Sequence, residues 1–339
     1  MRAAAFTDLV GPSGVETVEL PDPEPGPGEA VVEMRACSLN HHDLWILRGG
    51  SVMVDPSDLP FVSGLDLAGV VDEVGPDVTG VEPGDRVLLC PNETCGTCRY
   101  CREGPENLCA NYSLYHGGFA ERAAVEADRL VALPDGVDFE TAAALPTAYM
   151  TAYRMLARAD VEPGDTVFVP GAAGGVGVAA VQLAAVLGAE SIATSSKAAK
   201  CDRLAGLGAD HVVEAGDIEA VREAVESAGL VPDAAVNHLG GEWSALSLDL
   251  LARGGRMVVC GRTAGDVSEF DVAQLFRQHQ HVRGSTMGTQ TDLERVVDLV
   301  DRGAFDPPVG GTYPLDDADE AFAAMQERTA FGKLLLTRQ

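Results

Sequence analysis

The sequence predicts an α/β protein in which a doubly wound parallel sheet is joined to a second, mostly β domain. From about residue 146 onward, short apolar runs alternate with helical stretches, which is the pattern of βαβ units. Before that point the chain is rich in glycine, proline and short β-like runs. A glycine-rich turn, GAAGGVG at 171–177, separates one of the strands from the helix that follows it.

The mostly β domain is predicted from three runs: AVVEMRA (30–36), LAGVVDEVG (67–75) and DRVLLC (85–90). They alternate or run apolar between turn signals such as PGPG and EPGD, as the strands of a packed sheet do. Near the end of the chain, KLLLT (333–337) is also strand-like.

The second domain is predicted from strands and helices in alternation. The strands are 166–171, 191–196, 211–215, 233–240 and 255–261, and the helices are 175–188, 201–208 and 217–228. This order is that of a Rossmann sheet, in which helices connect parallel strands.

Composition and charge limit the classes of partner. The chain has 339 residues, 46% of them hydrophobic, which is enough to bury two domain cores. Its apolar runs end well short of the roughly 18 residues of a membrane helix, and its start lacks a signal-peptide core, so we expect a cytoplasmic protein. With 24 basic and 52 acidic residues, the net charge of −28 repels nucleic acid and anionic membranes. The expected partner is a small molecule.

Lysine is rare in this chain. Lys197, Lys200 and Lys333 are the three lysines, and every other basic residue is arginine. An acidic, lysine-poor surface is typical of a halophilic cytoplasm, where a Debye length of about 3 Å at 1 M salt screens self-repulsion. The alternative is a GC-rich genome, which favours arginine but does not explain the acid excess.

The glycine-rich turn predicts a dinucleotide site. Glycines permit a tight turn and close backbone approach, and the helix N-terminus then offers free N–H groups to a pyrophosphate. The alternative is a turn that only lets the helix and strand pack. The residues assigned to the cofactor here are Ala172, Gly174, Gly175, Val176 and Gly177.

The end of the second strand indicates which dinucleotide binds. An NAD site usually places an acid there for the ribose 2′-OH, but ATSSKAAK (193–200) has none. Ser195 and Ser196 can hydrogen-bond a 2′-phosphate, and Lys197 and Lys200 can neutralise it. We therefore predict NADPH, the alternative being two solvated lysines at a helix start.

Four of the eight cysteines predict a structural zinc. Cys95, Cys98, Cys101 and Cys109 share the lobe 90–112, and their short spacing lets four thiolates face one tetrahedral ion. Four sulfur ligands leave no open position for water, so the site is structural. Disulfides are the alternative and fit poorly with a cytoplasmic protein.

These motifs together resemble the zinc-containing medium-chain dehydrogenase/reductase superfamily, which includes alcohol dehydrogenases and quinone oxidoreductases. The resemblance rests on the cysteine lobe ahead of GAAGGVG and on EVGPDVTGVEPGDRV (73–87), GGFAERAAV (117–125), AALPTAYMTAYRML (143–156) and FGKLLL (331–336). It implies a GroES-like domain over 1–148 with 285–339 and a Rossmann domain over 149–284. It also implies a homo-dimer or homo-tetramer joined through the nucleotide-domain sheets.

The resemblance fails at the catalytic zinc of the alcohol dehydrogenases. Its three protein ligands correspond here to Asn40, Leu65 and Thr147. Leucine cannot coordinate a metal, and Asn and Thr are poor zinc ligands, so we expect no catalytic zinc. A substitute site from His41, His42 and Asp66 remains an alternative, although adjacent histidines rarely converge on one ion.

By family position, Asn40 and Thr147 line the vacated pocket and hydrogen-bond the acceptor oxygen. His42 is the candidate proton donor, since histidine donates a proton near neutral pH, and Asp43 completes the motif NHHD (40–43). The alternative makes the histidines surface or cofactor-phosphate contacts. The resemblance adds Thr151 and Gly261 to the cofactor residues.

Loss of the metal restricts the chemistry. Alcohol oxidation needs a Lewis acid for the alkoxide, whereas a quinone or an α,β-unsaturated carbonyl spreads the incoming charge over itself. We therefore predict an NADPH-dependent reductase of such acceptors. An alcohol dehydrogenase and a non-catalytic nucleotide-binding redox sensor are the alternatives.

Overall fold

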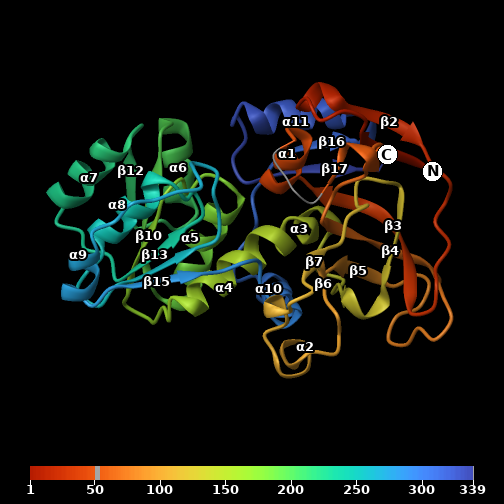
Figure 1. Ribbon diagram of the computed structural model, residues 1–339, viewed down its shortest axis with the longest axis horizontal. Coiled ribbons are helices and arrows are strands. Elements are labelled where there is room, and N and C mark those ends of the chain that lie inside the picture. Colours follow the sequence, from red (N-terminus) through yellow and green to blue (C-terminus); the bar gives the residue numbers. More distant parts are fainter. Residues whose placement is uncertain (50–53, 339) are drawn as a thin grey trace. The chain divides into compact units, whose positions relative to one another are not determined.

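The computed structural model describes residues 1–49 and 54–338 and divides into two compact units (Figure 1). Unit 1 comprises residues 1–147 and 289–339, and unit 2 comprises residues 148–288. These boundaries lie one and four residues from the expected ones. Residues 50–53 and 339, which the expected first domain included, lie outside the described residues.

Unit 1 is built on a seven-stranded sheet. Six strands follow the order β16-β17-β3-β4-β5-β9, and β8 pairs with β3. β17 runs antiparallel to β3, so the C-terminal segment completes the N-terminal sheet. Two further pairs are β1 with β2 and β6 with β7. The strands are β1 (Arg2–Phe6), β2 (Val15–Glu19), β3 (Glu29–Ser38), β4 (Asp66–Val74), β5 (Arg86–Leu89), β6 (Asn92–Glu93), β7 (Ser113–Leu114), β8 (Arg122–Glu126), β9 (Leu130–Ala132), β16 (Val309–Pro314) and β17 (Lys333–Thr337).

Helices cover and connect these strands. The α-helices are α1 (His41–Leu47), α2 (Arg99–Glu103), α3 (Phe139–Ala143), α10 (Gln290–Asp301) and α11 (Ala318–Gln326). A π-helix, η5 (Leu145–Met150), follows α3, and unit 1 ends within it. The core centres on the inner faces of β1, β3 and β4, where Phe6, Phe119 and Phe322 pack edge to face.

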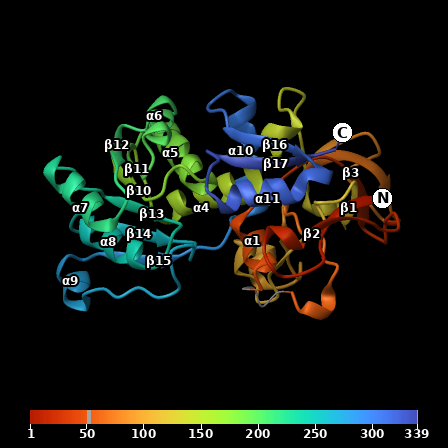
Figure 2. The ribbon, with the colours of Figure 1, turned by 90° about the horizontal axis from the view of Figure 1, so that it is seen from above.

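Unit 2 is a six-stranded parallel sheet in the order β12-β11-β10-β13-β14-β15, which Figure 2 shows running between two sets of helices. Among these helices, α4 packs against α5, and α7 packs against α8. The strands are β10 (Thr166–Val169), β11 (Glu190–Ser195), β12 (His211–Glu214), β13 (Ala234–Asn237), β14 (Arg256–Val259) and β15 (His281–Gly284). The helices are α4 (Thr151–Arg158), α5 (Gly175–Leu187), α6 (Ala198–Gly206), α7 (Ile218–Ser227), α8 (Glu242–Leu250) and α9 (Val272–Arg277).

The expected α/β architecture is confirmed, with a mostly β first unit and a doubly wound parallel sheet in the second. Every predicted strand of the second domain is present, but the edge strand β15 and the helices α4, α8 and α9 were not predicted. Among the described residues, no helix has the length and apolar character needed to cross a bilayer.

Candidate active site and metal lobe

The ends of three neighbouring strands bring polar side chains together in unit 1. Ser38 ends β3, Asp66 begins β4 and Lys333 begins β17. β3 pairs with both other strands, and Ser38 lies opposite Asp66 on one side and Leu335 on the other. Sheet pairing thus joins segments from both ends of the chain at one place.

Asp66 is the centre of this cluster. Its side chain is fully buried, and five hydrogen bonds reach its carboxylate. Oδ1 accepts from the Thr147 amide at 3.0 Å and from the Thr147 hydroxyl at 2.6 Å. Oδ2 accepts from Ser38 Oγ at 2.6 Å, Asn40 Nδ2 at 2.9 Å and Lys333 Nζ at 3.2 Å. Because a carboxylate offers about four lone-pair positions, the acceptor capacity of Asp66 is used up.

Asn40 and Thr147, both predicted to line the pocket, therefore meet through Asp66. The buried Asn40 amide directs Nδ2 to Asp66 and, at 3.5 Å, to the Ser38 carbonyl, while its Oδ1 accepts from Lys333 at 2.6 Å. The half-buried Thr147 hydroxyl donates to Asp66. Hydrogen bonds from either residue to an acceptor oxygen must compete with these internal contacts.

A second group of polar side chains adjoins the first turn of α1. The fully buried Asp43 carboxylate accepts the Asn40 backbone N–H at 2.7 Å and the Ser63 hydroxyl at 2.5 Å. Ser63 Oγ also lies 3.4 Å from Nδ1 of His116. The His116 ring stacks on His42, with the ring centroids 5.4 Å apart and 23° between the planes.

Burial sets the protonation of this second group. It lowers the pKa of His42, although the carboxylates of Asp43 and Asp66 act to raise it. It also lowers the pKa of His116 to about 4. Burial raises the pKa of Asp43, against the effect of its neighbour His42 and of its hydrogen bonds. Nε2 of His42 is buried and has no hydrogen-bond partner among the described residues, so this nitrogen has the capacity to exchange a proton.

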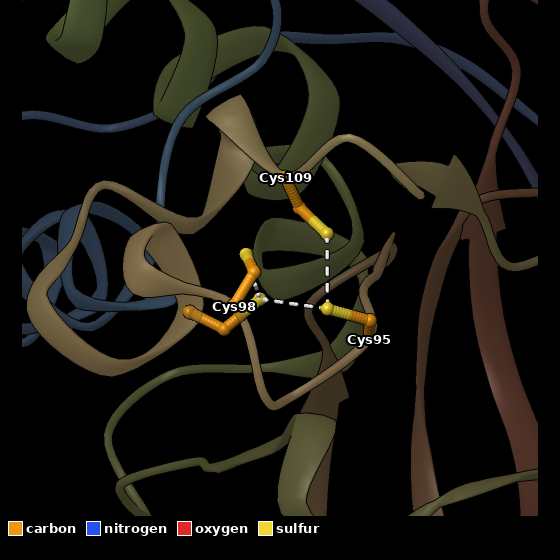
Figure 3. Close-up of side chains that lie close together, drawn as sticks. Cys95, Cys98 and Cys109 are labelled. Atoms are coloured by element: carbon orange, nitrogen blue, oxygen red, sulfur yellow. Dashed lines mark hydrogen bonds between the residues drawn. The ribbon is translucent and has the colours of Figure 1, made fainter.

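The four predicted zinc ligands converge in the lobe around α2 (Figure 3). All four sulfurs lie within 4.8 Å of one another, with Sγ separations of 3.4 Å for Cys98–Cys101, 3.5 Å for Cys95–Cys109 and 3.9 Å for Cys95–Cys101. Four sulfurs bound tetrahedrally at about 2.3 Å would lie about 3.8 Å apart, so the cluster fits one Zn²⁺. Hydrogen bonds from Thr97 lower the pKa of Cys95 to about 6, which favours the thiolate.

This lobe is distinct among the described residues. Over 1–49 and 54–338, no other group of three or more His, Cys, Asp or Glu ligand atoms lies as close together. The ligand atoms of the alternative second site, His41, His42 and Asp66, therefore do not converge on one point in this structure.

In unit 2, the predicted pyrophosphate loop lies between β10 and α5. The N-cap residue Gly174 gives the helix end no side-chain cap, and Gly175 and Val176 follow in the first turn. A Cβ on Gly174 would meet open space, whereas one on Gly177 would lie 2.6 Å from the Ala172 Cα. Glycine at 177 lets the helix pack on the loop, and the uncapped end beside open space suits a pyrophosphate.

The predicted 2′-phosphate residues lie where β11 leads into α6. Ser195 is buried at the end of β11, and its Oγ accepts the Lys197 amide at 3.4 Å. Ser196 and Lys197 are exposed, and Lys200 is half-buried in the first turn of α6, which begins at Ala198. This stretch presents hydroxyl and ammonium groups and no carboxylate.

Thr151 and Gly261 also lie in unit 2. Thr151 begins α4, is 4% exposed and directs its hydroxyl to the Met287 sulfur at 3.7 Å. Gly261 follows β14, and a Cβ there would lie 2.0 Å from the His238 carbonyl oxygen. Only glycine at 261 permits this approach of the loops after β13 and β14.

Four residues were not identified from the sequence as part of the unit 1 site: Ser38, Ser63, His116 and Lys333. His116 directly precedes GGF in GGFAERAAV, and this adjacency was the available signal. The other three are single polar residues in or near apolar strands, where nothing local distinguishes a site residue from a surface one.

The fold is that of an oxidoreductase with a GroES-like and a nucleotide-binding domain. Residues 26–135 match the family described as "Alcohol dehydrogenase GroES-like domain", and residues 175–302 match "Zinc-binding dehydrogenase". The chain therefore belongs to the medium-chain dehydrogenase/reductase superfamily and is an oxidoreductase with a nicotinamide cofactor.

Among its relatives is the acryloyl-coenzyme A reductase of Metallosphaera sedula, 32% identical over 331 residues, which are 96% of each protein. A solved NAD-dependent alcohol dehydrogenase is 36% identical with a TM-score of 0.91, covering 100% of both chains. A 2-octenoyl-CoA carboxylase reductase, solved with NADP and 2-octenoyl-CoA, is 28% identical with a TM-score of 0.88, covering 98% of this chain and 84% of the other.

Proposed function

We propose that the protein is an NADPH-dependent reductase of α,β-unsaturated carbonyl compounds, with enoyl thioesters as the favoured class, and that it works without a catalytic zinc. The observation that carries the proposal is the Asp66 cluster. Where the family's catalytic ligands would stand, the chain has Asn40, Leu65 and Thr147, and the nearby carboxylate is saturated by five hydrogen bonds. The likeness to acryloyl- and octenoyl-coenzyme A reductases supports the thioester class.

The chemistry needs a hydride, a proton and a stabilised carbonyl oxygen. When bound, NADPH supplies the hydride to the β-carbon of the substrate. The C=C π electrons then shift so that negative charge resides on the carbonyl oxygen and the α-carbon, and a proton added at the α-carbon completes the saturated product.

This chain's residues supply the proton and the hydrogen bonds. We assign the proton to His42, whose buried Nε2 has no partner among the described residues. We assign the hydrogen bond to the substrate's carbonyl oxygen to the second amide hydrogen of Asn40. Within the protein this hydrogen has only a 3.5 Å contact with the Ser38 carbonyl. Asp43 stabilises the protonated His42 by charge, and Thr147 lines the pocket while holding Asp66.

A panel of acceptors tests the reaction class. Oxidation of NADPH should be fastest with acryloyl- or crotonyl-type thioesters, slower with simple enones and quinones, and absent with aldehydes. A preference for quinones would contradict the enoyl thioester class and indicate a quinone reductase instead. Faster reduction of aldehydes by NADPH, or oxidation of alcohols when NADP⁺ is supplied instead, would favour the alcohol dehydrogenase alternative, which the 36% identity to an NAD-dependent alcohol dehydrogenase supports. Binding of NADPH with no turnover on any acceptor would favour the sensor alternative.

We infer NADPH over NADH from the lysines at the end of β11. The double substitution Lys197→Ala/Lys200→Ala should raise KM for NADPH at least tenfold and leave kcat/KM for NADH nearly unchanged, because only NADPH carries the 2′-phosphate. Arg203→Ala, on the same helix α6, is the matched control and should change neither. A wild-type preference for NADH would contradict the assignment.

A further inference from the structure

A buried lysine lies at the centre of the unit 1 site. Lys333 is 5% exposed, and its Nζ donates to the Leu39 carbonyl at 2.8 Å, Asn40 Oδ1 at 2.6 Å and Asp66 Oδ2 at 3.2 Å. An ammonium has three N–H donors, so all of them are engaged within the protein. Lys333 therefore has no donor left for a substrate and can act only through the groups it holds.

We propose that Lys333 is a positioning residue, which fixes Asn40 and the start of α1 so that His42 is presented for proton transfer. The inference rests on the proposed function and deepens it. Lys333 holds two consecutive residues, Leu39 and Asn40, immediately before the helix. The Asn40 backbone N–H in turn donates to Asp43 in the first turn, and His42 lies between these two residues.

The identity of the side chain matters as much as its charge. The three acceptors surround a single nitrogen, which suits the compact tripod of an ammonium and not the planar fork of a guanidinium. This lysine occurs in a chain where every basic residue except Lys197, Lys200 and Lys333 is arginine. The geometry gives a reason for lysine at this position.

The pair of Lys333 with Asp66 also satisfies two buried charges. Asp66 is fully buried, and removal of either partner alone would leave the other charge uncompensated in a low-dielectric interior. Removal of both charges together would leave no uncompensated charge, although the Leu39 carbonyl and Asn40 Oδ1 would lose their lysine donor. A double variant therefore separates the stabilising role of the pair from its positioning role.

The test compares Lys333→Met, Asp66→Asn and the double variant with the wild-type enzyme. Each single substitution should lower the Tm by about 5–10 °C, because it leaves a buried charge unpaired. Lys333→Met should also lower kcat at least tenfold while KM for NADPH stays within about twofold, since the cofactor residues belong to unit 2. The double variant should regain part of the Tm, because no charge is left unpaired, and it should keep the low kcat, because the lysine hydrogen bonds to Leu39 and Asn40 are still missing. The control is Arg35→Met, which removes an exposed ion pair with Glu33 on the same strand β3 and should change neither quantity.

Two results would overturn the proposal: full kcat in Lys333→Met, or recovery of kcat together with Tm in the double variant, which would show a purely structural pair. A readout without turnover separates this outcome from failure of the proposed function. The His42 resonance in ¹⁵N-histidine NMR spectra, measured without substrate, should shift in the double variant and remain unchanged in Arg35→Met. An unshifted His42 resonance would contradict the positioning role even if the wild type reduced none of the acceptors.

Discussion

At the scale of single residues, the sequence predicts some of the clustered side chains but not what they contact, and it does not identify Ser38, Ser63, His116 or Lys333 as part of the cluster. Asn40 and Thr147 are found by family position, yet their hydrogen bonds to Asp66 span 26 and 81 residues of sequence. Lys333 joins the same carboxylate across 267 residues. Such contacts depend on strand pairing, and no local pattern encodes the direction of an amide or hydroxyl hydrogen.

The proposed donor role of His42 predicts a defined pH dependence. Burial lowers the pKa of His42 below the ordinary 6.5, so the protonated imidazolium is the main form only at a pH below this lowered pKa. A donor that must be protonated loses activity as pH rises through its pKa, so kcat should fall with rising pH across a midpoint below 6.5. His42→Gln should lower kcat by roughly 10²-fold or more and abolish this limb of the profile. His41→Gln, at the exposed neighbour, should keep the limb, and full kcat in His42→Gln would dismiss the donor role.

At the scale of elements, the sequence is informative wherever strands are apolar and flanked by turn residues. β10, β11 and β12 were located to within about two residues because TVFV, SIATS and HVVE interrupt polar surroundings. The edge strand β15 (His281–Gly284) was missed because HVRG is largely exposed and has no apolar run. The start of α6 at Ala198 was missed because KAAK has no N-cap signal.

The cysteine lobe is an element whose order should depend on metal. α2 has only five residues, too short to be stable alone, so the convergence of the four thiols must supply the missing stabilisation. We expect about one zinc per chain by elemental analysis and a fall of several degrees in Tm when a chelator removes it. Cys95→Ser should reproduce this loss, while Cys260→Ser, outside the cluster, should not. Two zinc ions per chain would contradict the zinc-free active site.

At the scale of the whole molecule, the edge of the unit 2 sheet suggests how two copies associate. Within 1–49 and 54–338, β15 pairs with β14 on one side only, and the segment around it exposes Val272, Phe276 and Val282 at 67%, 63% and 42%. The amides of His281 and Ser285 donate toward β14, so by alternation the Val282 amide faces away from it. An apolar edge with outward donors is a template for a second copy of the same strand.

The predicted assembly is a homo-dimer, or a homo-tetramer built from such dimers, and one substitution tests it. Val282→Pro removes the outward N–H without removing a bond to β14, and it should halve the molar mass measured by light scattering, from dimer to monomer or from tetramer to dimer. Val231→Thr, at an exposed apolar residue far from β15 in sequence, is the control and should leave the mass unchanged. A wild-type monomer at micromolar concentration would contradict the expectation.

The net charge of −28 predicts that salt stabilises the protein, whereas the ion pairs alone predict that salt destabilises it. Most of the ion pairs between described residues have an exposed partner, such as Arg2 with Asp316 and Arg302 with Asp298, and salt weakens these contacts. The 52 acidic groups outnumber the 24 basic ones, however, so repulsion within the excess negative charge outweighs the attraction in the ion pairs, and screening relieves more repulsion than it removes attraction.

Stability should therefore rise with salt, and Tm should increase by at least several degrees between 0.1 M and 2 M KCl. A variant with about eight exposed acids changed to asparagine or glutamine separates screening from the general strengthening of apolar burial by salt, because it should be more stable at 0.1 M and gain less at 2 M. Equal Tm at both salt concentrations would remove the halophilic interpretation and leave the arginine content as a matter of genome composition.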